Sequence, residues 1–136
     1  MSEEQHMVRE FHRRAGLGAP ERPTWLGEER HRVLVALIEE ELAEFRNAGE
    51  TRSLVEVADA LGDLLYNVYG AAVEYGIDME PVFAEIHRSQ LSKCEPRAMR
   101  RADGTVAKGE NYRPPRLKEI IEAQTAEEEL EEAATV

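Results

Sequence analysis

Cysteine is nearly absent from this chain, because Cys94 is the only one. One thiol excludes an intrachain disulfide framework and is too little for a Cys-based zinc site. Long apolar runs are lacking too, and none approaches the roughly 18 residues that a membrane helix needs. The opening residues, MSEEQHMVREF, carry acids where a secretory signal has basic residues and then an apolar stretch. We therefore expect a cytoplasmic protein with no membrane partner.

Basic residues are also scarce, with 17 Lys and Arg against 28 Asp and Glu and a net charge of −11. This balance argues against a nucleic-acid partner, since phosphate binding needs a basic face. Part of the charge lies in residues 122–136, which hold six glutamates and no Lys or Arg. We expect this acidic tail to be disordered. The remaining −5 lies on the body of the chain.

Apolar residues recur at helical spacing, and strand-like alternation is scarce. The pattern predicts an all-α protein, an antiparallel bundle of four to five helices in one domain, residues 1–121, followed by the tail. The helices are expected near 3–15, 28–48, 51–75, 79–94 and 115–124, with residues 95–115 irregular. Gly49 and Gly76 are expected to end the second and third helices. A core of this size predicts a homo-oligomer, a homodimer or homotetramer.

Carboxylates interrupt the apolar face of the predicted second helix, in the segment IEEELAEF. The apolar face is predicted to hold Val33, Leu34, Leu37, Ile38 and Phe45. At 100° per residue Glu41 and Glu44 fall inside this face and Glu40 falls on its flank. They could be solvated acids at a fraying edge. However, burying a carboxylate without a partner costs several kcal/mol, so two such residues favour a bound cation.

The predicted third helix has a narrow polar stripe opposite its apolar one. The polar stripe consists of Glu56, Asp59, Asp63 and Asn67, and the predicted core stripe consists of Leu54, Val57, Leu61, Leu65, Val68 and Ala72. An ordinary solvent face has this form, but it normally mixes Lys and Arg with the acids. No Lys or Arg occurs from Leu54 to Tyr75. The stripe therefore favours a metal site.

Two acid pairs follow from this placement, Glu41 with Glu44 and Glu56 with Asp59, each three residues apart. If the helices face each other, the pairs present four hard oxygen ligands, which suit Mg²⁺ or Mn²⁺. Mg²⁺ bound by carboxylates usually completes its shell with water and substrate phosphate. The pattern therefore indicates phosphoryl chemistry.

These residues resemble the all-α nucleoside triphosphate pyrophosphohydrolases, the superfamily of MazG and phosphoribosyl-ATP pyrophosphohydrolase. The resemblance rests on EExxE at Glu40, Glu41 and Glu44, then eleven residues, then ExxD at Glu56 and Asp59. The segments VREFHRRAGL, EVADALGDLLYNVYGAAVEYGID, VFAEIHRSQLSKC and DGTVAKGENYRPP look like the branch with dimeric MazG-like dUTP pyrophosphatases and their phage relatives. The resemblance covers roughly residues 5–121, and a phage origin would place the protein in the host cytoplasm.

The resemblance implies Mg²⁺-dependent hydrolysis of a (deoxy)nucleoside triphosphate, such as dUTP, dGTP or dATP, to the monophosphate and pyrophosphate. It implies that Glu41, Glu44, Glu56 and Asp59 are metal ligands and that Glu40 orients or deprotonates the attacking water. On this interpretation Mn²⁺ can replace Mg²⁺.

Two positions depart from the pattern or leave its register open. Gln90 stands where the branch often has Asn. Asp63 precedes Leu64 and Leu65 much as the aspartate of the family precedes an apolar pair. Asp63 is therefore an alternative ligand or a substrate contact, and Asn67 a further substrate contact.

Lys93, Lys108 and Tyr112 are candidate substrate-binding residues. Lysine is a flexible point-charge donor suited to triphosphate oxygens, although surface lysines are common. Lys108 lies in a loop followed by Tyr112, which could close over the substrate or pack on Pro114. We expect Phe11 to pack in the core and His12 to lie at the surface. Trp25 is expected to be a packing anchor.

Two other functions remain open at this point. One is a catalytically silent helical module that binds a nucleotide or a partner helix through the same cleft. The other is phosphoribosyl-ATP pyrophosphohydrolase activity, which shares the fold and the chemistry but not the substrate.

Overall fold

The fold of this protein is all-α, as predicted. The computed structural model describes the backbone of residues 1–134 and the side chains of residues 1–126. The helices are α1 (Glu3–Ala15), α2 (Glu28–Thr51), α3 (Leu54–Tyr75), α4 (Met79–Ser92) and α5 (Lys118–Ala134). Within residues 1–134 the β-structure is limited to one isolated bridge between Arg100 and Val106. None of the described helices combines the length and hydrophobicity needed to cross a membrane.

Side-chain caps explain where three of the helices begin. Ser2 accepts a hydrogen bond from the Gln5 amide, Ser53 from the Glu56 amide and Asp78 from the Glu80 amide. Each cap satisfies a main-chain donor that has no partner within its helix. Ser53 is therefore the N-cap residue of α3.

Two predicted helix ends were wrong. Helix α2 continues through Gly49 to Thr51, and the left-handed residue that follows it is Arg52, with φ 56°. A single glycine weakens a helix by only about 1 kcal/mol, which the surrounding turns overcome. Helix α5 runs to Ala134, past the end predicted at residue 124, because its Ala- and Glu-rich sequence favours helix. The division into a domain of residues 1–121 and a disordered tail of residues 122–136 stays a prediction, and residues 135–136 lie outside the described residues.

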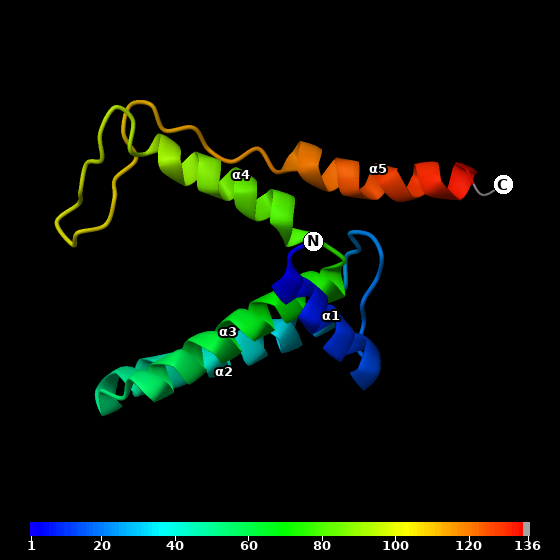
Figure 1. Ribbon diagram of the computed structural model, residues 1–136, viewed down its shortest axis with the longest axis horizontal. Coiled ribbons are helices and arrows are strands. Elements are labelled where there is room, and N and C mark those ends of the chain that lie inside the picture. Colours follow the sequence, from blue (N-terminus) through cyan, green and yellow to red (C-terminus); the bar gives the residue numbers. More distant parts are fainter. Residues whose placement is uncertain (135–136) are drawn as a thin grey trace. The chain divides into compact units, whose positions relative to one another are not determined.

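The described chain divides into two compact units, and the first, Met1–Ile77, contains α1, α2 and α3. Helices α2 and α3 lie side by side as an antiparallel hairpin, and α1 packs on α3 (Figure 1). Small and apolar side chains fill the contacts, among them Val8, Leu34, Ala60 and Val73. The hairpin places the acids of α2 next to those of α3.

The predicted core stripe of α3 is largely exposed in the single chain, which corrects the expectation. Leu54 is 84% exposed, Leu61 47% and Leu65 53%. Of the predicted stripe, α3 buries Ala72, and it also buries Ala60 and Val73, since α1 and α2 are the helices that pack against it in this unit. An apolar stripe with no covering element is typical of an interaction surface.

The second unit, from Asp78 onward, consists of α4, α5 and the segment between them. After α4 the chain forms a loop and returns beside the same helix (Figure 1). Ser89 Oγ donates to the Arg113 carbonyl at 2.8 Å, and the Arg113 amide donates to Ser92 Oγ at 2.8 Å. Gln124 pairs with both the amide and the carbonyl of Asp78. Side chains of α4 and α5 therefore hold main-chain groups of this unit in place through hydrogen bonds.

Replacing Gly76 with alanine is expected to destabilise the protein by more than about 1 kcal/mol. Gly76 has φ 68°, and an added Cβ would collide with the carbonyl oxygen of Arg22. Gly49→Ala is the matched control, because its Cβ would meet no atom within 4 Å and helical alanine is favoured by about 0.5–1 kcal/mol. Urea unfolding of both variants tests this expectation, and equal effects of the two substitutions would contradict it.

Candidate functional site

Three carboxylates meet between α2 and α3. One oxygen from each of Glu41, Glu44 and Asp63 lies within 4.8 Å of the other two. Glu41 and Glu44 are one turn apart on α2, and Asp63 faces them from α3. We call these three residues the carboxylate cluster. It includes Asp63, which the ExxD spacing had ranked below Asp59.

Glu41 is the member of the cluster that is least satisfied by the protein. Its Oε2 atom is buried and has no hydrogen-bond partner among the described residues. Burial raises the pKa of Glu41, and the hydrogen bond with Glu44 and the negative charges of Glu44, Asp63 and Glu40 raise it further. A cation among these oxygens would offset the repulsion and would give the Glu41 oxygen a partner. The donor set therefore fits a hard divalent ion.

The second predicted pair, Glu56 and Asp59, lies in a different place from the cluster. Together with Glu44 these residues line a hollow of about 220 Å³ that also contains Asn47 and Thr51. Glu44 therefore belongs to both groups of acids. Glu40, the predicted catalytic residue, is exposed on α2 beside Glu41.

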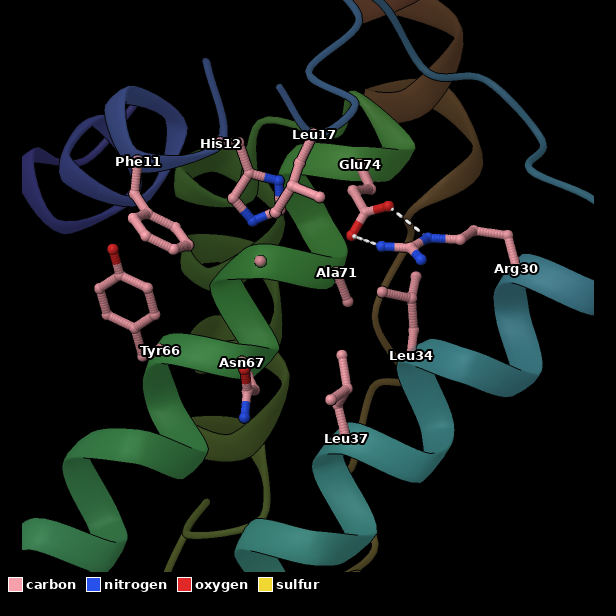
Figure 2. A pocket seen from close by; sticks show the side chains of 11 residues that line it. Phe11, His12, Leu17, Arg30, Leu34, Leu37, Tyr66, Asn67, Ala71 and Glu74 are labelled. Atoms are coloured by element: carbon pink, nitrogen blue, oxygen red, sulfur yellow. Dashed lines mark hydrogen bonds and ion pairs between the residues drawn. The ribbon is translucent and has the colours of Figure 1, made fainter. Parts of the chain in front are cut away.

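A larger pocket of about 310 Å³ is lined by residues of α1, α2 and α3 (Figure 2). Leu37 is one turn before Glu41, and Asn67 is one turn after Asp63. The pocket is lined by Phe11, His12, Leu17, Arg30, Leu34, Leu37, Tyr66, Asn67, Gly70, Ala71 and Glu74. Its volume falls within the range of small-molecule sites, and apolar walls with few polar groups are typical of them.

Aromatic and charged pairs border this pocket. Phe11 meets the Tyr66 ring edge-to-face at a centroid distance of 5.9 Å. Arg30 donates two hydrogen bonds to the buried Glu74 carboxylate, at 2.7 and 3.0 Å (Figure 2). Arg30 and Glu74 thus satisfy each other's charge. Asn67 adds a neutral side-chain amide to the pocket lining.

His12 contributes to the pocket although the sequence predicted a surface position. It is 5% exposed, and its Nδ1 lies 3.2 Å from the Gly18 carbonyl. Its ring packs on Gly70, where an added Cβ would lie 3.2 Å from Nε2. The glycine at this point of α3 makes room for the His12 ring. The sequence alone does not show this role of Gly70, because the two residues meet only in the folded protein.

The other aromatic expectations were wrong in the single chain. Phe11 is 50% exposed, and Trp25 is 71% exposed. Trp25 stacks on His31 at 5.9 Å and lies against Tyr75 at 5.7 Å. Trp25 therefore contacts two aromatic rings while most of its surface stays exposed.

Lys93, Lys108 and Tyr112 come together within the second unit. The ammonium groups of Lys93 and Lys108 lie 5.9 and 5.0 Å from the centre of the Tyr112 ring. Both distances permit cation–π attraction, and the half-buried Tyr112 thus holds two positive charges near one point. Gln90 lies exposed on α4.

The first unit thus combines an all-α hairpin, a carboxylate cluster suited to a divalent cation and a pocket of small-molecule size. These are features of a helical protein that binds a small molecule next to a metal ion. A family model described as phosphoribosyl-ATP pyrophosphohydrolase (PRA-PH) matches residues 8–90. The chain belongs to this family, and the match supports a nucleotide pyrophosphohydrolase activity. A comparison with curated proteins finds no match.

The raised pKa of Glu41 predicts how the stability of the metal-free protein depends on pH. The folded state binds the Glu41 proton more tightly than the unfolded state, so its contribution to stability is lost as pH rises above about 4.3, the ordinary pKa of glutamate. Glu41→Gln should therefore stabilise the protein relative to the wild type, increasingly so toward neutral pH.

Urea unfolding in EDTA across this pH range measures the effect. Glu39→Gln is the control, because Glu39 is exposed on α2 and is not part of the cluster. A stability difference between Glu41→Gln and wild type that stays constant with pH would contradict the expectation.

Proposed function

We propose that this protein is a Mg²⁺-dependent deoxynucleoside triphosphate pyrophosphohydrolase that releases the monophosphate and pyrophosphate. The observation that carries the proposal is the carboxylate cluster, with oxygens within 4.8 Å and a buried, unpartnered Oε2 on Glu41. The family match over residues 8–90 supports the reaction class.

The residues that would hold Mg²⁺ are Glu41, Glu44 and Asp63, with Glu56 and Asp59 as ligands on the far side of Glu44. Because Glu44 belongs to both groups, it is the residue whose loss should affect every bound ion. When bound, Mg²⁺ or Mn²⁺ supplies positive charge against the phosphate oxygens and acidifies water. The carboxylates of α2 and α3 would determine where the bound ion lies.

Glu40 is proposed to orient the attacking water and accept its proton. The water oxygen then forms a bond to the α-phosphorus, and the bond from this phosphorus to the oxygen that bridges to the β-phosphorus breaks. The bridging oxygen leaves with pyrophosphate, and the nucleoside monophosphate retains the new oxygen. Glu40 is exposed next to Glu41, and it can therefore reach solvent water.

The pocket beside the cluster is proposed to hold the nucleoside. Phe11 and Tyr66 supply aromatic surface for the base, and the Asn67 amide supplies both a donor and an acceptor for its edge. Such a pocket suits dUTP or a purine deoxynucleotide. Lys93, Lys108 and Tyr112 stay candidate substrate-binding residues, as the sequence predicted, and within the second unit two ammonium groups lie around one ring.

A homo-oligomer, a homodimer or homotetramer, is part of the proposal. The stripe of α3 with Leu54, Leu61 and Leu65 is exposed in one chain, and no Lys or Arg occurs from Leu54 to Tyr75. Contact with a second copy would remove this apolar surface from water.

Incubation with each deoxynucleoside triphosphate and Mg²⁺ is expected to yield monophosphate plus pyrophosphate. Glu44→Gln should lower kcat/KM by about 100-fold or more, because the loss removes a shared ligand. Asp63→Asn and Asp59→Asn form a matched pair, and we expect the larger loss for Asp63 because it lies in the cluster. Glu39→Gln, an exposed acid of the same helix, should leave turnover unchanged.

Three outcomes would contradict the proposal. Release of orthophosphate alone would exclude attack at the α-phosphorus. Turnover of phosphoribosyl-ATP in preference to every deoxynucleotide would favour the substrate named in the family description. Absence of both turnover and Glu41-dependent Mg²⁺ binding in calorimetry would favour a catalytically silent nucleotide- or partner-binding module.

Leu65→Lys is expected to shift the protein toward the monomer, because it places a charge in the exposed apolar stripe of α3. Met7→Lys is the control, since Met7 is similarly exposed, at 56%, on another helix. Light scattering coupled to gel filtration measures the mass of each variant. A wild-type monomer, or an unchanged oligomer with Leu65→Lys, would contradict the proposed interface.

A further inference from the structure

The second unit carries a concentration of positive charge that the net charge of the chain conceals. Residues 88–118 contain nine Lys and Arg against three Asp and Glu, whereas the whole chain carries −11. The cations are not spread evenly, because three arginines line one hollow of about 500 Å³. We call it the arginine hollow, and its lining consists of Glu85, Arg88, Arg113, Arg116, Glu119 and Ile120.

Arg88 is held in a fixed orientation at this hollow. Its Nε and Nη2 atoms donate to the two Glu85 oxygens at 2.6 and 2.8 Å, and Nη2 also reaches the Pro114 carbonyl at 3.2 Å. Glu85 in turn accepts the Arg116 main-chain amide at 2.6 Å. These contacts with Arg88 and with the Arg116 amide hold the pKa of Glu85 down at about 2. The Glu85 carboxylate is therefore paired with Arg88 and holds the main chain at Arg116, so Arg88 offsets most of its negative charge.

Arg113 and Arg116 retain donors that can face a ligand. Arg113 forms one ion pair, from Nη2 to Glu95 at 2.9 Å, which leaves most of its guanidinium donors uncommitted. No carboxylate in the described part of the chain forms an ion pair with Arg116. Both residues lie on the segment that Ser89 and Ser92 attach to α4.

We propose that the arginine hollow binds an oligophosphate group, free or on a nucleotide, without a metal ion. Planar guanidinium groups pair with phosphate oxygens through two parallel hydrogen bonds. A hollow of about 500 Å³ has room for two or three linked phosphates, which can engage more than one arginine. The site uses none of the residues of the carboxylate cluster, and its binding does not depend on the proposed reaction.

The experiment measures binding of pyrophosphate to the full chain by calorimetry in EDTA, which removes any metal-dependent site. Saturable binding is expected, and Arg116→Gln should weaken it by roughly tenfold through the loss of a charge-assisted pair. Arg116→Gln keeps the main-chain amide that Glu85 accepts. Arg97→Gln is the matched control, because Arg97 is an exposed arginine of the same segment that does not line the hollow.

Glu119→Gln provides a test with a gain of function, because it removes a negative charge from the wall of the hollow and should tighten binding several-fold. A parallel titration with dUTP in EDTA distinguishes the two sources of the group: tighter binding of dUTP assigns the site to a nucleotide, and tighter binding of pyrophosphate assigns it to the free anion. Absence of saturable binding of either would overturn the proposal. Equal weakening by Arg116→Gln and Arg97→Gln would overturn it too, since this would show a diffuse charge effect.

Discussion

The repulsion among Glu41, Glu44 and Asp63 is the physical constraint on which the proposed function rests. Their oxygens lie within 4.8 Å, and one Glu41 oxygen is buried without a partner among the described residues. Packing of α2 against α3 forces this approach, so the free energy gained by burying Leu34, Ala60 and Val73 offsets its cost. A hairpin that stores like charge in this way is ready to bind a cation, and the family match is consistent with this use.

The pocket and the cluster share α2 and α3, so the proposed nucleoside site and the proposed metal site lie on one hairpin. Leu37 and Asn67 are each one turn from a cluster residue, so a ligand in the pocket would lie next to the cluster. His12, seated on Gly70, closes the pocket from α1. On the proposed function, the helical hairpin would set the distance between the nucleoside and the phosphates that are cleaved.

In the second unit, the long irregular segment between α4 and α5 is held against α4 by hydrogen bonds. Glu85, Arg88, Ser89 and Ser92 form a polar face of α4 that pairs with the returning chain at residues 113–116. The same pairing gathers Arg88, Arg113 and Arg116 around one hollow. The hydrogen bonds that hold residues 113–116 on α4 thus also place the arginines of the candidate anion site.

The sequence by itself determined the all-α class and the unusual acids of α2 and α3. These features are local, since helical periodicity depends on neighbours within a few residues. Only the tertiary structure decided that Asp63, rather than Asp59, joins Glu41 and Glu44, and that His12 is buried while Leu61 and Leu65 are exposed. Helical periodicity fixes the direction of a side chain around its own helix, but the position of one helix along and around another is set by packing between distant residues.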